Sequence, residues 1–341
     1  MKKIALLGPN LESPGGVNVF IHHLNKFFIN KGFEVHLFPV GKTKIKDSKY
    51  IHPIDTNKKQ IQFRLLTEKL KKFTFDLIIA NNLRTSSILS SLNLNNDLYV
   101  MHQGRIIQNS RMFIAFKQKR KFKKIFNGKR LVFLNECFKN EFLKKFQIDI
   151  SYKIIPNPFD FEEIKHKANE FMVNGEYIVY VGRLEEGKNL EYLINAYAKS
   201  KINKELWLVG YFKYKSYEKK ILRLITKLNI QNKVKLLGWQ NNPYPFIKNA
   251  SLLVHPSKFE SFGNVLVEAL ILNTPVIATD IKCGPREILI DELSDFLVPL
   301  KNERVFANKI YQALERYPEI KERYIEKYNF KNVGEQYLQF L

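Results

Sequence analysis

Short apolar runs alternate with longer amphipathic segments along the whole chain. In its first half, six runs have the length and apolar content of β-strands, at residues 3–8, 34–40, 76–80, 98–102, 130–134 and 152–156. The segments between them, such as 16–31 and 58–72, are long enough to form crossover helices. Because nearly continuous apolar strands alternate with helices, the pattern predicts a parallel sheet covered on both faces.

The same alternation begins again in the second half. Its expected strands are residues 177–182, 205–210, 233–238, 251–256, 275–280 and 296–299. A chain of 341 residues is long enough for two domains, so we predict two doubly wound α/β domains in tandem. Two prolines interrupt the pattern in I-P-N-P-F-D (155–160), which places the boundary there. Ligands of such sheets bind beyond the carboxyl ends of the strands, and two facing domains would form a cleft.

The charge of the chain is positive and uneven. The formal net charge is +23, and most of it falls in residues 1–150, which hold 28 Lys+Arg against 10 Asp+Glu. The segment M-F-I-A-F-K-Q-K-R-K-F-K-K-I-F-N-G-K-R (112–130) concentrates this charge, with eight basic residues and no acidic one from 117 to 130. A strongly basic half is expected to meet an anionic partner or surface.

Two interpretations of this basic segment overlap. Its apolar residues recur at spacings of three and four, which predicts an amphipathic helix (Phe113, Phe116, Phe122, Ile125, Phe126). The helix could lie on an anionic inner leaflet, with the membrane contacted by Lys117, Lys119, Arg120, Lys121, Lys123 and Lys124. Alternatively its apolar side packs on the sheet as a crossover helix, leaving only the cations in solvent. Nucleic acid is a third interpretation, but no recognised nucleic-acid motif accompanies the patch, so no specific nucleic acid is expected.

The location of the protein is predicted from its apolar runs. The N-terminal run ends at Gly8-Pro9-Asn10, too soon for a targeting segment, and fits a first strand instead. No window approaches the roughly 18 apolar residues of a membrane-spanning helix. We therefore expect a cytoplasmic protein that is peripheral on the inner face of the plasma membrane.

The first stretch with candidate chemistry follows the strand at 177–182. In G-R-L-E-E-G-K-N (182–189), Arg183 and Lys188 flank an acidic turn, and a helix opens at or just after Asn189. Two cations beside a helix N-terminus can bind a phosphate group. The alternative is a solvated turn in which Lys188 pairs with Glu185 or Glu186.

A second stretch, K-F-E-S-F-G-N-V-L-V-E-A-L (258–270), carries Glu260 and Glu268. Eight positions along a helix separate two residues by about 12 Å, so these carboxylates do not form a tight catalytic dyad. We expect Glu260 in a loop and Glu268 one turn inside a helix that begins near Asn264. Backbone N–H groups at that helix start suit a diphosphate, and the carboxylates can accept hydrogen bonds from vicinal hydroxyls. The alternative is that Glu260 is exposed and Glu268 is satisfied where the helix meets the sheet.

The absence of three motifs argues against some classes of enzyme and against a bound metal. The chain has no G-x-G-x-x-G and no P-loop pattern, which argues against a dinucleotide-dependent oxidoreductase and a P-loop enzyme. It also has no Asp-x-Asp, the usual carboxylate pair for a metal–diphosphate complex. We expect no metal and no cofactor other than the co-substrate, with Arg183 and Lys188 supplying positive charge instead.

Three segments, taken in order, resemble the retaining GT-B glycosyltransferases of family 4: G-R-L-E-E-G-K-N (182–189), H-P-S-K-F-E-S-F-G-N-V-L-V-E-A-L (255–270), and P-V-I-A-T-D (275–280) followed by G-P-R-E-I-L (284–289). The likeness extends to P-G-G-V (14–17), to 155–160 and to Y-N-F-K-N-V-G-E-Q-Y (328–337), so it spans nearly the whole chain. It implies an acceptor-side domain at 1–160, a nucleotide-sugar domain at 161–324, and a C-terminal helix within 325–341 that packs back on the first domain.

The resemblance also implies roles for single residues. Arg183 and Lys188 would hold the diphosphate, Glu260 would contact the donor sugar, and Glu268 would bind the ribose hydroxyls. The remaining implied donor-site residues are backbone or loop positions (Gly15, Gly16, Gly263, Asn264, Val265) and Trp239 in the base-binding loop. His102, at the end of strand 98–102, would face the transferred sugar; the alternative is a packed residue at a strand end.

The expected function is a metal-independent hexosyltransferase. It would move a hexose or N-acetylhexosamine, with retention, from a UDP-sugar to a lipid-linked, lipopolysaccharide or capsule glycan. Two alternatives stay open: a nucleotide-sugar enzyme of the same fold with a soluble acceptor, such as a synthase or epimerase, and a basic module that binds anions or nucleic acid without catalysis.

Overall fold

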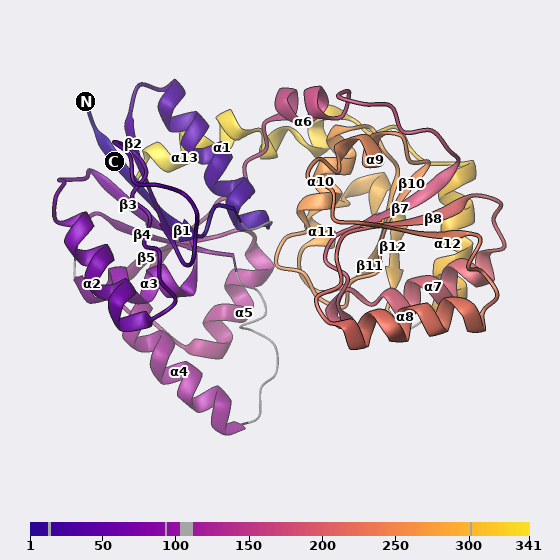
Figure 1. Cartoon of the computed structure of the whole chain (residues 1–341), viewed down its shortest axis with the longest axis horizontal. Helices are drawn as coiled ribbons and strands as arrows, with labels where there is room; N and C mark the ends of the chain where they lie inside the picture. The colour runs from indigo at the N-terminus through magenta and orange to yellow at the C-terminus, as the bar shows by residue number, and fades with distance from the viewer. Residues whose placement is uncertain (13–14, 93, 103–111, 301) are drawn as a thin grey trace. The chain divides into compact units, whose positions relative to one another are not determined.

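The computed structural model describes residues 1–12, 15–92, 94–102, 112–300 and 302–341, and for 112–116 it describes the backbone only. The chain divides into two compact units (Figure 1). Unit 1 comprises Met1–Phe159 and Tyr328–Leu341, and unit 2 comprises Asp160–Lys327. The final segment of the chain thus belongs to the same unit as its first.

Unit 1 is built on a sheet of six parallel strands in the order β2-β1-β3-β4-β5-β6. The strands are β1 (Lys3–Pro9), β2 (Glu34–Val40), β3 (Leu77–Ala80), β4 (Asp97–Met101), β5 (Lys129–Phe133) and β6 (Ile150–Ile154). All six strands predicted from the apolar runs are confirmed, and their bounds differ from the predicted ones by at most two residues.

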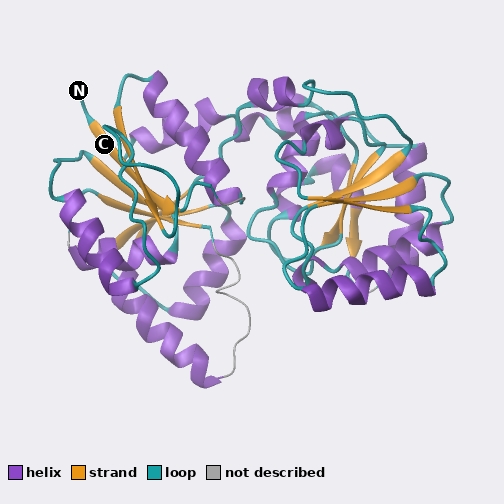
Figure 2. Ribbon diagram, viewed as in Figure 1, coloured by secondary structure: helices purple, strands orange, loops and turns teal. Residues whose placement is uncertain are grey.

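Helices cover both faces of this sheet (Figures 1 and 2). They are α1 (Gly16–Asn30), α2 (Lys59–Leu70), α3 (Leu83–Leu89), α4 (Met112–Phe126), α5 (Glu136–Phe146) and α13 (Phe330–Leu338). Helix α13 packs on α1, where a Cβ atom on Gly334 would lie 2.3 Å from Cγ of Phe27. Glycine therefore permits the close approach of these two helices.

A phenylalanine-rich core lies between the sheet and helices α4 and α5. Phe122 of α4 stacks on Phe146 of α5 with ring centroids 4.4 Å apart, and Phe126 meets Tyr99 of β4 edge to face. These side chains are buried, because they pack on apolar side chains of the sheet such as Leu131 and Phe133 of β5.

Unit 2 has its own sheet of six parallel strands, in the order β12-β11-β10-β7-β8-β9. They are β7 (Tyr177–Val181), β8 (Glu205–Val209), β9 (Val234–Gly238), β10 (Leu252–His255), β11 (Val276–Asp280) and β12 (Leu297–Pro299), again as predicted. The direction of winding reverses between β7 and β10, which pair directly. The loops after these two strands therefore meet at one edge, where ligands of such sheets bind.

The helices of unit 2 also lie on both faces (Figure 2). They are α6 (Phe161–Lys167), α7 (Leu190–Ser200), α8 (Lys215–Lys227), α9 (Tyr244–Lys248), α10 (Asn264–Ile271), α11 (Pro285–Ile288) and α12 (Glu303–Glu315). Helices α7 and α12 pack on each other over a core that includes Tyr180, Leu208 and Phe306.

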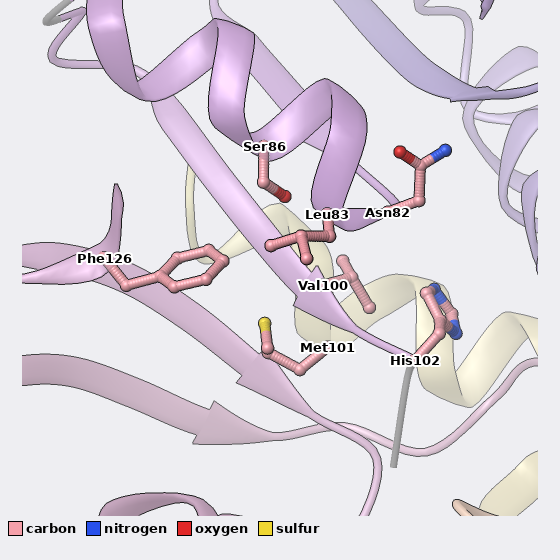
Figure 3. Close-up of a pocket in the computed structure, with 7 residues that line it drawn as sticks. All are labelled: Asn82, Leu83, Ser86, Val100, Met101, His102 and Phe126. Atoms are coloured by element: carbon pink, nitrogen blue, oxygen red, sulfur yellow. The ribbon is translucent and has the colours of Figure 1, made fainter. Parts of the chain in front are cut away.

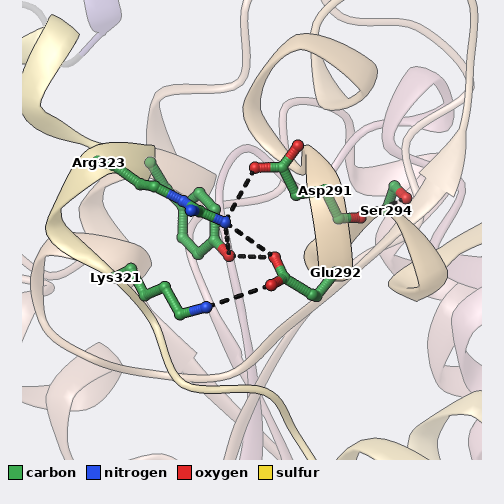
Figure 4. A network of polar contacts seen from close by, with 6 residues as sticks. Asp291, Glu292, Ser294, Lys321 and Arg323 are labelled. Carbon is green, nitrogen blue, oxygen red and sulfur yellow. Dashed lines mark hydrogen bonds and ion pairs between the residues drawn. The ribbon is translucent and has the colours of Figure 1, made fainter.

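A polar network holds the last part of unit 2 to its body (Figure 4). Arg323 contacts both Asp291 (3.3 Å) and Glu292 (3.4 Å), Lys321 lies 3.2 Å from Glu292, and the hydroxyl of buried Tyr324 donates to Glu292. The short helix η5 (Glu322–Tyr324) is thereby fixed against η4 (Asp291–Phe296), next to the point where the chain returns to unit 1.

Among the residues that the structure describes, every helix is too short or too polar to cross a lipid bilayer.

Candidate functional site

The loops after β7 and β10 are joined by their backbones. The loop after β7 forms the short helix η3 (Glu186–Lys188), and Gly187 in it accepts a hydrogen bond of 3.0 Å from the N–H of Lys258 in the loop after β10. This contact brings the two motifs that sequence analysis singled out, 182–189 and 258–270, to the same edge of the sheet.

Lys188 reaches across this junction to Glu260. Its ammonium forms an ion pair with Oε1 of Glu260, and the same oxygen lies 2.8 Å from Nε2 of His255 at the end of β10. The pairing of Lys188 with Glu185 or Glu186, the alternative for this turn, is therefore wrong. Glu260 is not exposed either, because its side chain keeps only 12% of its accessible surface.

The environment of Glu260 keeps it ionised. Burial alone would raise the pKa of Glu260, but the positive charge of Lys188 and the hydrogen bond with His255 outweigh burial and hold that pKa well below its usual range. A permanently charged carboxylate with one oxygen engaged can still accept hydrogen bonds from ligand hydroxyls through the other.

Glu268 has the opposite environment. It is the fifth residue of α10, one turn inside the helix as predicted, and is only 9% exposed. Within the described parts of the chain no hydrogen bond or ion pair reaches its carboxylate, so the alternative of a satisfied junction residue is not what the structure shows. Burial raises the pKa of Glu268 to about 7. A buried carboxylate without a partner is destabilising unless a ligand supplies donors.

The start of α10 is shaped by two glycines. Gly263 is the N-cap residue, with φ of 103°, and no side chain among the described residues caps this helix end. Gly284, after β11, also has positive φ, and a Cβ atom there would lie 2.6 Å from the carbonyl oxygen of Phe262. Larger residues would push these loops apart, so the glycines permit the close packing of the loops around the start of α10.

Arg183 and Trp239 lie at the same edge, after β7 and β9. The guanidinium of Arg183 is 3.2 Å from Glu185, and its side chain is 45% exposed. Trp239 is half exposed and meets the ring of Tyr211, after β8, edge to face at 5.9 Å. The N–H of Leu184 donates to the carbonyl of Tyr211 (2.9 Å), which connects the Arg183 turn to this aromatic pair.

Unit 1 carries the other predicted residues of the site. Gly15 is the N-cap of α1 and Gly16 is its first residue; Phe20, one turn later, packs its ring on His102 with centroids 4.6 Å apart. His102 follows β4 and lines a small pocket with Asn82, Leu83, Ser86, Val100, Met101 and Phe126 (Figure 3).

His102 is buried and neutral. Burial lowers its pKa to about 3, and its Nε2 atom has no hydrogen-bond partner among the residues that the structure describes. A neutral imidazole with an unsatisfied nitrogen can bind a hydroxyl group, although packing against Phe20 is also evident.

The basic helix α4 follows the packing interpretation in its described part. Phe122, Ile125 and Phe126 are buried in the core, whereas Phe113 and Phe116 lie outside the described side chains. The cations point outward: Lys117, Arg120, Lys121, Lys123 and Lys124 are exposed, and Lys119 is half-buried and donates to Gln147. A packed apolar side and a cationic outer side therefore coexist on one helix.

Two residues that contribute to this site were not predicted from the sequence. His255 forms a hydrogen bond with Glu260. Tyr244, at the start of α9, has a raised pKa, caused first by burial and second by the negative charge of nearby Glu268. His255 ends a parallel strand, a position that could have identified it. Tyr244 had no such signal, because only the packing of α9 beside α10 brings it near.

A model of a known protein family matches residues of unit 2 and the start of α13. The family model described as "Glycosyl transferases group 1" matches residues 161–331. A relative from Campylobacter jejuni, N-acetylgalactosamine-N,N'-diacetylbacillosaminyl-diphospho-undecaprenol 4-alpha-N-acetylgalactosaminyltransferase, is 39% identical over 163 residues, which are 48% of this chain and 43% of the relative. The capsular polysaccharide biosynthesis glycosyltransferase CapH of Staphylococcus aureus is 26% identical over 273 residues, 74% of this chain and 75% of CapH. The chain spans less than half of the length of the first of these relatives.

Solved structures of the same fold cover nearly the whole chain. Sucrose-phosphate synthase from Thermosynechococcus elongatus is 19% identical with a TM-score of 0.82, over 99% of this chain and 98% of that one. HepE of Anabaena in complex with UDP is 18% identical with a TM-score of 0.77, over 99% of both chains. These likenesses confirm the predicted GT-B fold with its two Rossmann-like sheets. The match of the family model to residues 161–331, half of the chain, shows that the chain belongs to the glycosyl transferases group 1 family.

Proposed function

We propose that the protein is a retaining glycosyltransferase of family 4 that transfers a hexose or N-acetylhexosamine from a UDP-sugar to a surface-glycan acceptor. The observation that carries this proposal is the contrast between Glu260 and Glu268 at one sheet edge. Glu260 is ionised and tied to Lys188 and His255, whereas Glu268 is buried without a described partner. Such a pair suits a ligand that brings both negative phosphate and neighbouring hydroxyls.

Each part of the donor has a place in this arrangement. Lys188 and Arg183 attract the diphosphate, and the N–H groups at the start of α10 (Gly263 to Val265) add donors for phosphate and sugar oxygens. The ribose hydroxyls donate to Glu268 and so satisfy its carboxylate. Trp239 offers an exposed ring for the base. HepE, a structural neighbour, was solved with UDP and with UDP-glucose, which supports uridine as the base here.

Reaction chemistry follows from the charges at the site. Arg183 and Lys188 stabilise the negative charge that develops on the departing diphosphate, so the transfer proceeds without a metal ion. That phosphate helps to deprotonate the acceptor hydroxyl on the same face, which gives retention. In unit 1, the family resemblance assigns the transferred sugar to His102 and the phosphates to Gly15 and Gly16.

The acceptor is a lipid-linked, lipopolysaccharide or capsule glycan. Relatives named for an undecaprenol-linked sugar, for lipopolysaccharide core and for capsule biosynthesis support this class. The cationic outer side of α4 would hold unit 1 on the anionic cytoplasmic leaflet of the plasma membrane, where lipid-linked acceptors are accessible.

The experiment that tests the proposal is thermal stabilisation by nucleotides. Wild-type protein, Glu268→Ala and a control, Glu162→Ala, are melted with UDP, GDP, ADP and their sugars; Glu162 is chosen because its side chain is 88% exposed. We expect a selective shift with UDP and UDP-sugars that Glu268→Ala loses and Glu162→Ala retains. Absence of any nucleotide shift in the wild type would contradict the proposal.

A further inference from the structure

We propose that Lys213, in the loop after β8, is a further diphosphate-binding residue of the donor site, and that the buried carboxylate of Glu185 positions Lys213 together with Arg183. This inference rests on the proposed function, since it concerns the same donor. Lys213 lies outside the motifs quoted above, and Glu185 was considered from the sequence only as an alternative partner of Lys188.

The loops after β7 and β8 continue the pairing of their strands. Beyond the strand ends, Gly182 N–H donates to Val209 (3.0 Å), Leu184 N–H to Tyr211 (2.9 Å) and Lys213 N–H to Leu184 (3.3 Å). Their tight contact depends on Gly210, where a Cβ atom would lie 1.9 Å from the carbonyl oxygen of Gly182. Residues 183 and 213 are therefore held on adjacent, hydrogen-bonded segments rather than on independent loops.

Glu185 lies between the two cations. One of its oxygens, Oε1, is 3.2 Å from the guanidinium of Arg183, and the other, Oε2, is 3.8 Å from the ammonium of Lys213. The carboxylate side chain is only 5% exposed, whereas Arg183 is 45% and Lys213 38% exposed. Because a buried carboxylate requires nearby positive charge, Glu185 keeps both cations close while their outer donors remain accessible to a ligand.

The neighbouring loop has the same arrangement, because the largely buried carboxylate of Glu260 forms an ion pair with Lys188. The two groups are connected, because the N–H of Lys188 donates to the carbonyl of Glu185 at 2.9 Å. Ion pairs and this hydrogen bond thus link three cations, Arg183, Lys188 and Lys213, with two carboxylates, Glu185 and Glu260. Within this linked group the net charge is positive, which suits an anionic group such as a diphosphate.

The ammonium of Lys213 is suited to phosphate rather than to base or sugar edges. It offers three donors and no acceptor, and its charge is concentrated at one atom. It also lies 5.1 Å from the centroid of the Tyr214 ring, which supports the side chain from a second direction. Lys213 would therefore add a charge-assisted contact to a phosphate oxygen, beside that of Arg183.

The test compares ligands that differ only in phosphate number. Binding of UDP, UMP and uridine is measured by calorimetry for wild type, Lys213→Ala and the control Lys215→Ala, an exposed lysine two residues further on. We expect Lys213→Ala to weaken UDP binding about tenfold, UMP binding less, and uridine binding not at all. Lys215→Ala should bind all three as the wild type does.

The positioning role of Glu185 is tested by a double-mutant cycle on UDP binding. If Glu185 holds Lys213 in place, Lys213→Ala should weaken UDP binding much less in a Glu185→Gln background than in the wild type. Glu186→Gln, the adjacent exposed carboxylate, should leave the effect of Lys213→Ala unchanged. Loss of stability alone would not produce this coupling.

Different outcomes would contradict the role of Lys213, the positioning role of Glu185 and the proposed function. Equal UDP affinity in wild type and Lys213→Ala, or equal losses for UDP and uridine, would overturn the inference while leaving the proposed function intact. Additive effects of Glu185→Gln and Lys213→Ala would overturn the positioning role. Wild-type protein that binds no uridine nucleotide would instead contradict the proposed function itself.

Discussion

Lys188 and Glu260 form an ion pair across two loops that are 72 residues apart in the chain. Both side chains are mostly buried, with exposed fractions of 17% and 12%. The pair therefore couples Lys188, the cation proposed to bind the donor phosphate, to the folding of unit 2. Each charge relies on the other, because little water reaches either side chain.

Removing only one partner of this pair should be strongly destabilising. Lys188→Ala leaves the buried charge of Glu260 with His255 alone, and we expect a loss of about 3 kcal/mol in the free energy of unfolding of unit 2. Urea unfolding followed by tryptophan fluorescence reports on this unit, because both tryptophans of the chain, Trp207 and Trp239, lie in it.

The double variant separates stability from binding. Lys188→Ala combined with Glu260→Gln should recover most of the stability but not the affinity for UDP. Lys199→Ala serves as the control, since Lys199 pairs with Glu303 at a more exposed site and should cost less than about 1 kcal/mol. Equal losses for Lys188→Ala and Lys199→Ala would contradict the prediction.

Ionisation of Glu268 should lower the free energy of unfolding as the pH rises. Its folded-state pKa of about 7 lies above the ordinary value of 4.5, so the folded protein retains a proton between these values that the unfolded chain has lost. The free energy of unfolding then falls across this window, and above it the buried charge has lowered that energy by about 3 kcal/mol.

A variant that lacks the charge of Glu268 should not show this pH-dependent loss of stability. At a pH of about 8, Glu268→Gln should be more stable than the wild type by roughly this amount, whereas near pH 4.5 the two should unfold alike. Urea titrations at both pH values provide the measurement. A less stable Glu268→Gln at the higher pH would show that the carboxylate has a partner after all.

The same group should make donor binding depend on pH. If ribose hydroxyls donate to the ionised form of Glu268, as proposed, affinity for UDP-glucose should rise about tenfold from pH 6 to 8 and level off above. UDP-glucose is the appropriate probe, because its phosphates do not titrate in this range. Calorimetry on Glu268→Gln, which should bind weakly and without this slope, provides the comparison.

The cationic outer side of α4 should control membrane binding. Replacing Lys121, Lys123 and Lys124 by Gln should weaken binding to vesicles with anionic lipid by roughly 1 kcal/mol per lysine at low salt. The control removes the same charge from exposed lysines of unit 2 (Lys201, Lys219, Lys227) and should bind as the wild type does. Equal losses in both triple variants would indicate a response to net charge only.

The inner side of α4 should contribute stability instead. Phe122→Ala removes a buried ring that stacks on Phe146 at 4.4 Å, and should lower the free energy of unfolding of unit 1 by about 3 kcal/mol. Differential scanning calorimetry measures this loss, and vesicle binding of the folded variant should be unchanged. Reduced vesicle binding with unaltered stability would favour the alternative in which the ring enters the membrane.

The secondary structure was predictable because it depends on local pattern. All twelve strands that the structure describes were predicted from short apolar runs, and the start of α10 was expected near Asn264. In the site, the positions of Glu260 in a loop and Glu268 one turn inside a helix follow from the same local pattern. The charge states of Glu260 and Glu268 could not be predicted from this pattern, since burial depends on neighbours that are remote in the chain.

The sequence by itself thus determined two parallel α/β sheets, their strands and helices, and the order of the motifs that identify the family. Only the tertiary structure decided which groups meet. It pairs Lys188 with Glu260 rather than with the nearby Glu185 or Glu186. Glu185 instead forms ion pairs with Arg183 and Lys213. The physical reason is that ion pairs form between loops made adjacent by strand order, and strand order arises from contacts over long separations that no local pattern records.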